Sequence, residues 1–540
     1  RDGTKLASVT DSTNYLDSSG NTNATYTVTA VIDGTEGTPS PKATVWTQNY
    51  LRIPLSPPGA NYEANDASPG DLDGDGQYEI VLKWQPADAK DNSQSGVTSN
   101  TYLDGLKLNG TRLWRIDLGP NIRSGAHYTQ HVVYDFDGDG KAEVAVKTAP
   151  GTKDGKGAYL HTGPAANDDD SKKYANSDGY ILSGPEYLTV FSGPTGEELA
   201  TVDYPVPRGT VSSWGDSYGN RVDRFNAGAG FVKDGGGKTA SGLPSILAQR
   251  GYYTRMTVAA YTFRAGKLEK NWIFDSNGSG NSKAAGQGNH SAMVADVDGD
   301  GAQEFITGAT TINSDGTLRC VTGLGHGDAL HVSEFIPGKG FSVFMPHEED
   351  GGYDLHDAST CTIIAKAVGT DDNGRGVAAD ISPSNPGGEF WTAAYDQLFS
   401  ATTGAAIGNK PKPTNFLIFW DADESRELLD GATISKYGGS TLLDGAGCAG
   451  NNGTKNTPTL TADLLGDWRE ELVVRETSNQ ALRIYTTTDV TKRRLYTLMH
   501  DPTYRMQVTF EQSSYNQPPH TGFHIGSGMK DPPKPDIFVK

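Results

Sequence analysis

Short apolar runs alternate with turn residues along almost the whole chain. Three times an Asp-rich loop runs into a strand-like stretch, as DLDGDGQYEIVLKW from residue 71, DFDGDGKAEVAVKT from 135 and DVDGDGAQEFITGA from 296. Hairpin-like stretches with Gly- or Thr-rich tips follow, such as LKLNGTRLWRIDL and LRIYTTTDVTKRRLYTL. Apolar runs of this length between turn signals predict short strands, and long amphipathic helices are not expected.

The Asp-rich loops also indicate a repeat. Degenerate copies begin at residues 380, 421 and 463, which are 41 and 42 residues apart. A repeat of about 40–50 residues that holds a loop, a strand and a hairpin is typical of one four-stranded propeller blade. The remaining length gives about eight blades, within the usual range for propellers. We therefore predict an all-β fold, with an eight-bladed β-propeller over residues 47–540.

Residues 1–46 follow a different pattern. The stretch ATYTVTAVIDGTEGTPSPKATVW alternates apolar and polar residues around a DG turn, then closes with Pro and a short strand. It is similar to the last strands of a fibronectin type III module, which predicts a partial β-sandwich ahead of the propeller. An extra hairpin of the main domain is the alternative interpretation.

The Asp-rich loops have the composition of calcium sites. Glycines within the DGDG core let the backbone curl so that the carboxylates converge, and calcium prefers six to eight oxygen ligands. The ligand positions of the three clear loops are Asp71, Asp73, Asp75, Gln77 and Glu79; Asp135, Asp137, Asp139, Lys141 and Glu143; and Asp296, Asp298, Asp300, Ala302 and Glu304, the fourth of each through its main-chain carbonyl. The degenerate loops add Asp421, Asp423, Asp463 and Glu471.

These loops are not EF-hands, because their Glu follows at the ninth position and opens a strand. We expect most of the ions to fasten turns rather than to act in catalysis. Calcium loops of this kind also occur in adhesion propellers, so the loops alone do not predict an enzyme.

Net charge narrows the choice of partners. The chain has 46 Lys and Arg residues against 66 Asp and Glu residues, a formal net charge of -20. This balance disfavours nucleic acid, an anionic membrane or any other polyanion, unless bound cations reverse it locally. No apolar run is long enough to span a bilayer. The chain begins at Arg1 without the apolar region of a signal peptide, and we expect a processed, secreted protein that binds calcium.

Cysteine usage is sparse. The chain has Cys320, Cys361 and Cys448, which form no C-x-x-C zinc motif and no disulfide framework. The three cysteines could form one disulfide or remain free structural thiols, and the sequence does not choose between these alternatives.

Candidate chemistry lies outside the repeats. The stretch QGNHSAMVADVDGDG carries His290, and GLGHGDALH carries His326, Asp328 and His331 in a Gly-rich loop. Two such loops suggest a metal site, whereas each histidine alone is more often an ordinary loop residue. Further polar loops present Arg375 in NGRGVAADI, Asn452, Gly453, Thr454 and Lys455 in NNGTKNTPT, and Tyr515 in SSYNQPPHTGFH. Motifs of hydrolase elbows, P-loops, dinucleotide-binding folds and zincins are absent, while a carboxylate pair for glycoside hydrolysis stays open.

Several of these stretches together resemble a known family. NDASPGDLDGDGQYEIVLKWQP, LSGPEYLTVFSG, HGDALH, GRGVAADI, NGTKNTP and YNQPPHTGF occur in this order and resemble the bacterial rhamnogalacturonan lyases of polysaccharide lyase family 11. The resemblance extends from about residue 15 to the C-terminus. It implies an eight-bladed calcium-rich propeller behind a fibronectin-like module. It also implies β-elimination of rhamnogalacturonan I, the pectic polymer of alternating rhamnose and galacturonate.

The resemblance further implies roles for individual residues. It assigns catalysis to Lys455 and Arg375, with Lys455 as the base because Arg stays protonated. It assigns a central calcium to Asp66, His290, His326 and Asp328. Sugar contacts are implied for Asn65, Asn452, Gly453, Thr454 and Tyr515. Gln85 stands in KWQP where relatives have Asp, which favours a sugar contact over a metal ligand.

Three further expectations complete the prediction. We expect a monomer that acts on its polymer in the endo mode, although IPGKGFSVFMPHEEDGGYD (336–354) is a candidate loop for blocking one end of a groove. A non-catalytic calcium-dependent carbohydrate-binding or adhesion propeller is the main alternative, and a glycoside hydrolase is another. Release of an unsaturated uronate distinguishes the lyase from both.

Overall fold

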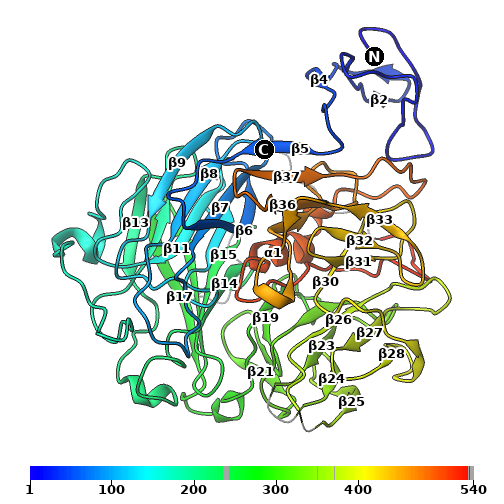
Figure 1. The fold of residues 1–540 in the computed structure, drawn as a ribbon. Coiled ribbons are helices and arrows are strands. Elements are labelled where there is room, and N and C mark those ends of the chain that lie inside the picture. The colour runs from blue at the N-terminus through cyan, green and yellow to red at the C-terminus, as the bar shows by residue number, and fades with distance from the viewer. Residues whose placement is uncertain (235–241, 349–350, 370, 533, 535–540) are drawn as a thin grey trace.

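Eight antiparallel sheets are arranged like blades around a central axis (Figure 1). The computed structural model describes residues 1–234, 242–348, 351–369, 371–532 and 534. Within them, strand order follows chain order in blades 1 to 7, so that each blade is a four-stranded meander with its first strand nearest the axis. The predicted all-β propeller with eight blades is confirmed.

The blades are built from short strands. Blades 1 and 2 are β6 (Tyr62–Gly70), β7 (Glu79–Pro86), β8 (Tyr102–Leu106) and β9 (Arg112–Asp117), then β10 (His131–Tyr134), β11 (Glu143–Thr148), β12 (Tyr187–Phe191) and β13 (Glu198–Asp203). Blades 3 and 4 are β14 (Phe225–Gly230), β15 (Ser245–Arg250), β16 (Thr257–Arg264) and β17 (Lys267–Asp275), then β18 (Met293–Ala295), β19 (Glu304–Thr307), β20 (Thr310–Ile312) and β21 (Leu318–Val321). Blades 5 and 6 are β22 (His331–Ser333), β23 (Ser342–Pro346), β24 (Tyr353–Asp357) and β25 (Ile363–Ala367), then β26 (Gly376–Ala379), β27 (Glu389–Thr392), β28 (Gln397–Ser400) and β29 (Ala406–Asn409). Blade 7 is β30 (Phe416–Ile418), β31 (Glu427–Asp430), β32 (Thr433–Ser435) and β33 (Thr441–Asp444).

Blade 8 closes the ring with strands from both ends of the chain. Its inner layer is β34 (Cys448–Ala449) and β35 (Leu460–Ala462), followed by β36 (Glu471–Glu476) and β37 (Ala481–Tyr485). The outermost strand is β5 (Leu51–Pro54), which pairs with β37 from more than 400 residues away in sequence. Since β35 also contacts β6 of blade 1, the first and last blades are joined at the axis and at the rim.

The core lies in the wedges between blades. Side chains alternate between the two faces of a strand, and both faces of every blade are covered by a neighbour. In β7, Ile80 and Leu82 pack toward blade 8, while Val81 packs toward blade 2. Both faces being buried explains why the inner strands appear in the sequence as continuous apolar runs.

The C-terminal segment fills the centre of the ring. After η5 (Leu498–His500), the helix α1 (Pro502–Phe510) lies against β10, β14 and β18, and Figure 1 shows it at the centre of the blades. Asp501 caps the helix by accepting a hydrogen bond from the amide of Thr503 at 3.2 Å. Eight of its nine residues are buried, so this helix is embedded rather than amphipathic.

Side chains of this segment pair with backbone groups of the inner strands. Gln507 donates from Nε2 to the carbonyls of Val294 and Val332 at 3.4 and 3.0 Å, and its Oε1 accepts from the amide of His520 at 2.8 Å. Gln512 accepts from the amide of His131 at 3.1 Å. These contacts reach blades 2, 4 and 5, so the plug holds several blades at once.

Residues 1–46 form two small sheets. Strand β1 (Thr25–Tyr26) pairs with β4 (Ala43–Thr44), and β2 (Val31–Ile32) pairs with β3 (Thr35–Glu36). Among the described residues these strands pair only with each other, which rules out the alternative of a hairpin added to a blade. Residues 10–14 reach the propeller, where Thr13 donates from Oγ1 to the carbonyl of Arg493 at 2.7 Å. The likeness to a fibronectin module stays a prediction.

One disulfide links two neighbouring blades. Cys320 of β21 is bonded to Cys361 in the turn after β24, which links blades 4 and 5. Cys448 is free. Over the described ranges, every helix is too short or too polar to cross a bilayer.

The axial plug predicts a large effect for a small change. Replacing Gln507 by Leu keeps the size of the side chain but leaves two carbonyls and one amide unpaired in a buried site. Each unpaired group costs about 1–3 kcal/mol, so we expect the urea midpoint of unfolding to fall clearly. Gln480→Leu at an exposed turn is the control and should leave the midpoint unchanged. Equal midpoints for the two variants would contradict the role of the plug.

Candidate active site

Functional side chains gather where the chain enters the innermost strands. His290 lies between β17 and β18, and His326 and Asp328 lie between β21 and β22. Glu348 belongs to the turn between β23 and β24, which emerges on the same face because neighbouring strands are antiparallel. The ligand atoms of these four residues all lie within 4.8 Å of one another.

The four side chains are oriented by hydrogen bonds and close contacts. His290 Nε2 lies 3.3 Å from Asp328 Oδ1, and His326 Nε2 lies 3.1 Å from Glu348 Oε2. His326 Nδ1 faces the carbonyl of Gly288 at 2.8 Å, so the proton belongs on Nδ1 and the Nε2 lone pair points into the cluster. That buried Nε2 has no hydrogen bond of acceptable geometry in the described chain. A divalent cation would satisfy it.

Electrostatics favour the neutral form of His290 and shift the pKa values of the two acids in opposite directions. Burial lowers the pKa of His290 well below its ordinary value. Burial raises the pKa of Asp328, and Lys455 opposes that shift. Burial also acts to raise the pKa of Glu348, but hydrogen bonds with His290 and His326 outweigh it and hold that pKa well below its usual range. The neutral form of His290, the Nε2 of His326 and the nearby carboxylates form a metal-binding set.

Two tyrosines support the cluster from behind. The Tyr253 hydroxyl contacts His290 Nε2 at 2.8 Å and Glu348 Oε2 at 2.9 Å. The Tyr252 hydroxyl lies 3.2 Å from His290 Nδ1 and equally far from His127 Nδ1. Burial, together with Arg224, lowers the pKa of His127 to about 4.

Lys455 and Arg375 lie beside the cluster. The Lys455 ammonium is 3.3 Å from Asp328 Oδ2 and 3.0 Å from the carbonyl of Gly374, and it lies 4.3 Å from the centre of the Tyr515 ring. Burial lowers the pKa of Lys455, and Arg375 acts in the same direction, whereas Asp328 opposes the shift. Arg375 donates to the carbonyl and the hydroxyl of Thr454 at 3.0 and 2.6 Å.

The loop that carries Lys455 is a break in an inner strand. The inner layer of blade 8 is interrupted between β34 and β35, and residues 450–459 project from the gap. Asn452 and Asn456 have positive φ angles of 56° and 52°, which turn η4 (Gly453–Lys455) toward the axis. Asn452 also hydrogen-bonds Asn516 Oδ1, which ties this loop to the segment after α1.

Close backbone approach requires glycine at Gly374. A Cβ there would lie 2.7 Å from Asp328 Oδ2, so no other residue fits without moving the cluster. The backbone around Tyr515 fixes the orientation of its side chain, because the neighbouring residues Ser514 and Asn516 both have positive φ angles of 48°. Its ring lies 4.8 Å from the rings of His127 and His290.

The predicted residues of blade 1 do not join the cluster. Asp66, expected as a ligand, instead forms a buried ion pair with Lys83 at 2.6 Å, and Asn451 Nδ2 lies 3.4 Å from its other oxygen. Asp66 therefore supports the loop that carries Lys455, and Glu348 completes the cluster in its place. Asn65 is buried next to Asp66 in the bulge of β6, and Gln85 is half-buried opposite Glu63. His331 also lies outside the cluster and contacts His520.

The Asp-rich loops lie on the opposite face. They join the first and second strands of their blades, at the other end of the innermost strands from His290 and Lys455. Carboxylates converge in four of them: Asp71, Asp73 and Glu79; Asp135, Asp137, Asp139 and Glu143; Asp296, Asp298 and Asp300; and Asp421, Asp423 and Glu427. Glu427 was not among the predicted ligands.

Other predicted loop ligands make local contacts. Asp75 accepts from the amide of Gln77 at 3.0 Å, and Asp139 and Asp300 accept from the amides of Lys141 and Ala302 at 2.8 and 2.9 Å. Glu304 accepts from the amide of Val297 at 3.1 Å. Asp463 accepts hydrogen bonds from the Thr497 hydroxyl and from the amides of Leu498 and Trp468. Glu471 accepts one from the amide of Leu465 at 2.9 Å. The loop at 463 therefore does not gather three carboxylates in the described structure.

Lysines enter three of these loops, and in the loop at 296 Lys233 Nζ lies 2.6 Å from Asp300 Oδ2. Lys436 Nζ lies 2.7 Å from carboxylates of Asp421, Asp423 and Glu427. Lys107 similarly approaches Asp73 at 2.5 Å and Asp75 at 3.0 Å. The loop at 135–143 has no ion pair to Lys or Arg within the described residues. Its donor set fits calcium best, because its four carboxylates are uncompensated.

The site can therefore hold a cation and place a buried amine next to it, at the mouth of the propeller axis. Such a combination stabilises an anionic substrate group and removes a proton near it. Nothing in this geometry resembles a nucleophile–His–Asp triad.

Comparisons with known proteins agree with this geometry. Residues 55–535 match the family model "Rhamnogalacturonan lyase family 11, C-terminal domain", and residues 1–46 match "Rhamnogalacturonan I lyases beta-sheet domain". This chain belongs to rhamnogalacturonan lyase family 11. It is 52% identical to the rhamnogalacturonan endolyase YesW of Bacillus subtilis, covering all of this chain and 87% of that protein. It is 48% identical to the exolyase YesX of the same organism, covering all of this chain and 92% of that protein.

Solved structures of this family have the same fold. The crystal structure of YesW superposes with a TM-score of 0.94 at 51% identity, over all of this chain and 93% of that one. The Bacillus licheniformis rhamnogalacturonan lyase superposes with a TM-score of 0.92 at 52% identity, over 98% of this chain and 91% of that one.

Sequence reasoning missed several residues of the family 11 site. Glu348 stands in MPHEEDGG, within the stretch predicted as a candidate groove-blocking loop; strand β23 ends at Pro346 just before it, and residues 349–350 lie outside the described residues. His127 and the pair Tyr252–Tyr253 gave no repeat or motif signal.

Proposed function

We propose that this protein is a calcium-dependent rhamnogalacturonan lyase. It would cleave the rhamnogalacturonan I backbone at rhamnose–galacturonate bonds by β-elimination and leave a 4,5-unsaturated galacturonate. Membership of family 11 and the activities named for YesW and YesX support the substrate. The observation that carries the mechanism is the Lys455 ammonium next to the His290–His326–Asp328–Glu348 cluster.

The chain's own residues can perform the elimination. The reaction removes the proton at C5 of galacturonate and expels the sugar oxygen at C4, while negative charge builds up next to an existing carboxylate. Lys455, whose pKa is lowered by burial, would accept the proton in its uncharged form. Arg375 presents a planar guanidinium suited to bidentate contact with the carboxylate. Tyr515 limits the position of the sugar and covers the Lys455 ammonium with its ring.

A cation bound by the cluster would supply positive charge to the substrate carboxylate. We propose calcium there and in the Asp-rich loops. The loops supply only oxygen donors, which suits calcium, while the two imidazoles of the cluster also suit a transition metal. Adding back calcium or zinc after chelation separates these two choices. Asn65, Gln85, Asn452, Gly453 and Thr454 would contact sugar hydroxyls around the cluster.

The same reasoning covers location and assembly. A disulfide between Cys320 and Cys361 is typical of oxidising compartments, which supports secretion to the cell exterior. The monomer stays a prediction, and so does the endo mode, because this chain is similarly close to an endolyase and an exolyase.

The first prediction concerns the base. Lys455→Ala should lower kcat on rhamnogalacturonan I by about 100- to 10,000-fold, the usual contribution of general acid–base catalysis. The measurement is the ultraviolet absorbance of the unsaturated uronate. Lys339→Ala, an exposed lysine on the opposite face, is the control and should remain active.

Near-normal activity of the Lys455→Ala variant, with the fold intact, would exclude Lys455 as the base. Wild-type protein that binds the polymer without any rise in absorbance would instead favour the carbohydrate-binding propeller. New reducing ends without the absorbance would favour a hydrolase.

A second prediction concerns the loops. Calcium should raise the melting temperature of the chelated protein. At a calcium concentration of 100 times the dissociation constant, one site should add about 2.7 kcal/mol to the free energy of unfolding. Glu143→Gln should reduce this rise, since it removes one charge from a loop without a lysine. Glu427→Gln is the matched control and should change the rise less, because Lys436 already neutralises that loop. An unchanged rise in the Glu143→Gln variant would show that loop 135–143 is not a calcium site.

A third prediction concerns the mode of cleavage. An endolyase cuts inside the polymer, so viscosity should fall early, while little absorbance has developed. The product ladder on size-exclusion chromatography should be broad. Release of one short product from the beginning would show the exo mode.

A further inference from the structure

One arginine close to the cluster has no partner. The guanidinium of Arg221 makes neither a hydrogen bond nor an ion pair with any of the described residues. Its Cζ lies 3.6 Å from the centre of the Tyr253 ring, and the side chain is half-buried. The ring covers one face of the guanidinium and leaves its N–H edge free to bind an anion.

The other cations of the site are already engaged. Arg224 is 5.2 Å from the same ring, but it donates to Asn220 at 2.6 Å and pairs with Asp91 at 3.4 Å. Arg375 donates to Thr454 and is already assigned to the reacting carboxylate. Arg221 instead lies directly behind Tyr253, whose hydroxyl touches two cluster ligands.

The loop that carries Arg221 is rigid. Asp216 accepts hydrogen bonds from the amides of Tyr218, Gly219, Asn220 and Arg221 at 2.7–3.1 Å. On the other side, Arg250 donates from Nε to the carbonyl of Val222 at 3.0 Å and from Nη2 to Asp223 at 3.0 Å. A guanidinium on such a loop loses little conformational freedom when it binds.

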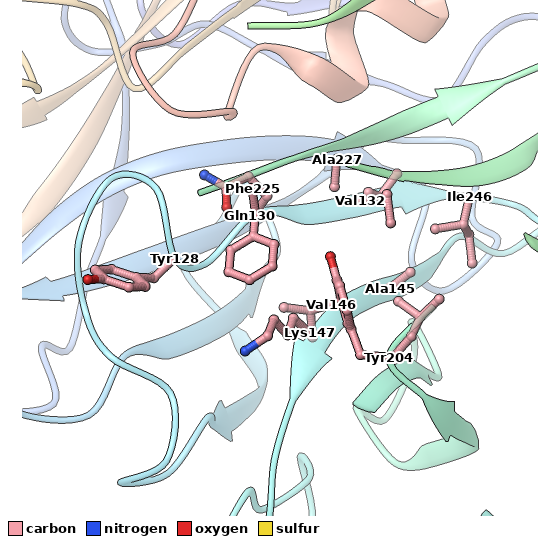
Figure 2. Close-up of a pocket in the computed structure, with 12 residues that line it drawn as sticks. Tyr128, Gln130, Val132, Ala145, Val146, Lys147, Tyr204, Phe225, Ala227 and Ile246 are labelled. Carbon is pink, nitrogen blue, oxygen red and sulfur yellow. The ribbon is translucent and has the colours of Figure 1, made fainter. Parts of the chain in front are cut away.

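The wall behind this loop is closely packed. A cavity of about 10 Å³ lies between blades 2 and 3, with room for about one water. Figure 2 shows its lining, with Lys147 below the ring of Phe225. Lys147 and Arg250 both pair with buried Glu186, at 3.1 and 2.8 Å, and fix this wall. The cavity itself is too small for a sugar.

Arg221 and Lys455 lie on different sides of the axis. Arg221 belongs to the connection between β13 and β14, which leads into blade 3, whereas Arg375 and Lys455 lie at the starts of blade 6 and of the inner layer of blade 8. The cluster lies between them: Lys455 contacts Asp328, Asp328 contacts His290, and Tyr253 connects His290 to Arg221. A bound chain that crosses the cluster would therefore meet a cationic group on each side.

We propose that Arg221 forms a second carboxylate-binding subsite, which holds a galacturonate one disaccharide repeat away from the reacting one. The proposal rests on the proposed lyase function and extends it to the polymer. Alternating galacturonates carry a carboxylate on every second sugar, so a polymer can use both ends of the site at once. A fragment with one galacturonate can use only the reacting end.

The test compares Arg221→Gln with the wild type on two substrates. On polymeric rhamnogalacturonan I, KM should rise about tenfold with kcat changed little, because binding away from the reacting atoms is lost. On an oligosaccharide with a single galacturonate, the two proteins should behave alike. Arg221→Lys keeps the charge but lacks the planar guanidinium, so its KM on the polymer should fall between those of the wild type and Arg221→Gln. Arg112→Gln, an exposed arginine on the outer strand of blade 1, is the control and should match the wild type.

Affinity electrophoresis in gels containing the polymer gives a readout that does not need turnover. Arg221→Gln should be retarded less than wild type, and the difference should shrink as salt is added. Equal KM and equal retardation for Arg221→Gln and wild type would overturn the subsite while leaving the lyase function intact. Absence of unsaturated product from wild type would overturn the lyase function. In that case, weaker retardation of Arg221→Gln would still support the anion site.

Discussion

The propeller depends on hydrogen bonds between its C-terminal segment and the inner strands of the blades. Each innermost strand has one edge that no neighbouring strand pairs with, and unpaired buried backbone groups are costly. Gln507 and Gln512 supply side-chain partners for carbonyls and an amide of four different inner strands. The same segment continues into Tyr515 and Asn516, so the plug that stabilises the ring also positions a wall of the site.

The two faces of the ring carry different chemistry. The face with the Asp-rich loops gathers carboxylates near the ends of short turns, where a bound cation would offset their repulsion. The other face gathers His290, His326, Asp328, Glu348 and Lys455 from blades far apart in sequence. Strand direction alone separates the two sets, because an innermost strand has one end on each face. In blade 1, the Asp-rich loop between β6 and β7 therefore lies on one face, whereas Asn65 and Asp66 of β6 lie nearer the other.

Charge is the central problem for an acidic protein of a family that acts on an acidic polymer. Most of its 66 acidic residues are balanced locally, by lysines such as Lys436 and Lys107 or by the donors of tight turns. At the site three cationic side chains, Lys455, Arg375 and Arg221, lie around the cluster. A cation bound there would add to this positive patch, and the buried surroundings would strengthen its effect on a substrate carboxylate.

The sequence by itself determined the repeat, the eight blades and the carboxylate convergence of the clear Asp-rich loops, because those features arise from residues close together along the chain. It also pointed to His290, His326, Asp328, Arg375 and Lys455, through loops that no packing pattern required. Only the tertiary structure decided that Glu348 joins the cluster and Asp66 does not, since the distance of each residue from His290 depends on how the ring closes. The free guanidinium of Arg221 was hidden for the same reason: whether an arginine has a partner depends on contacts between blades, which no local pattern records.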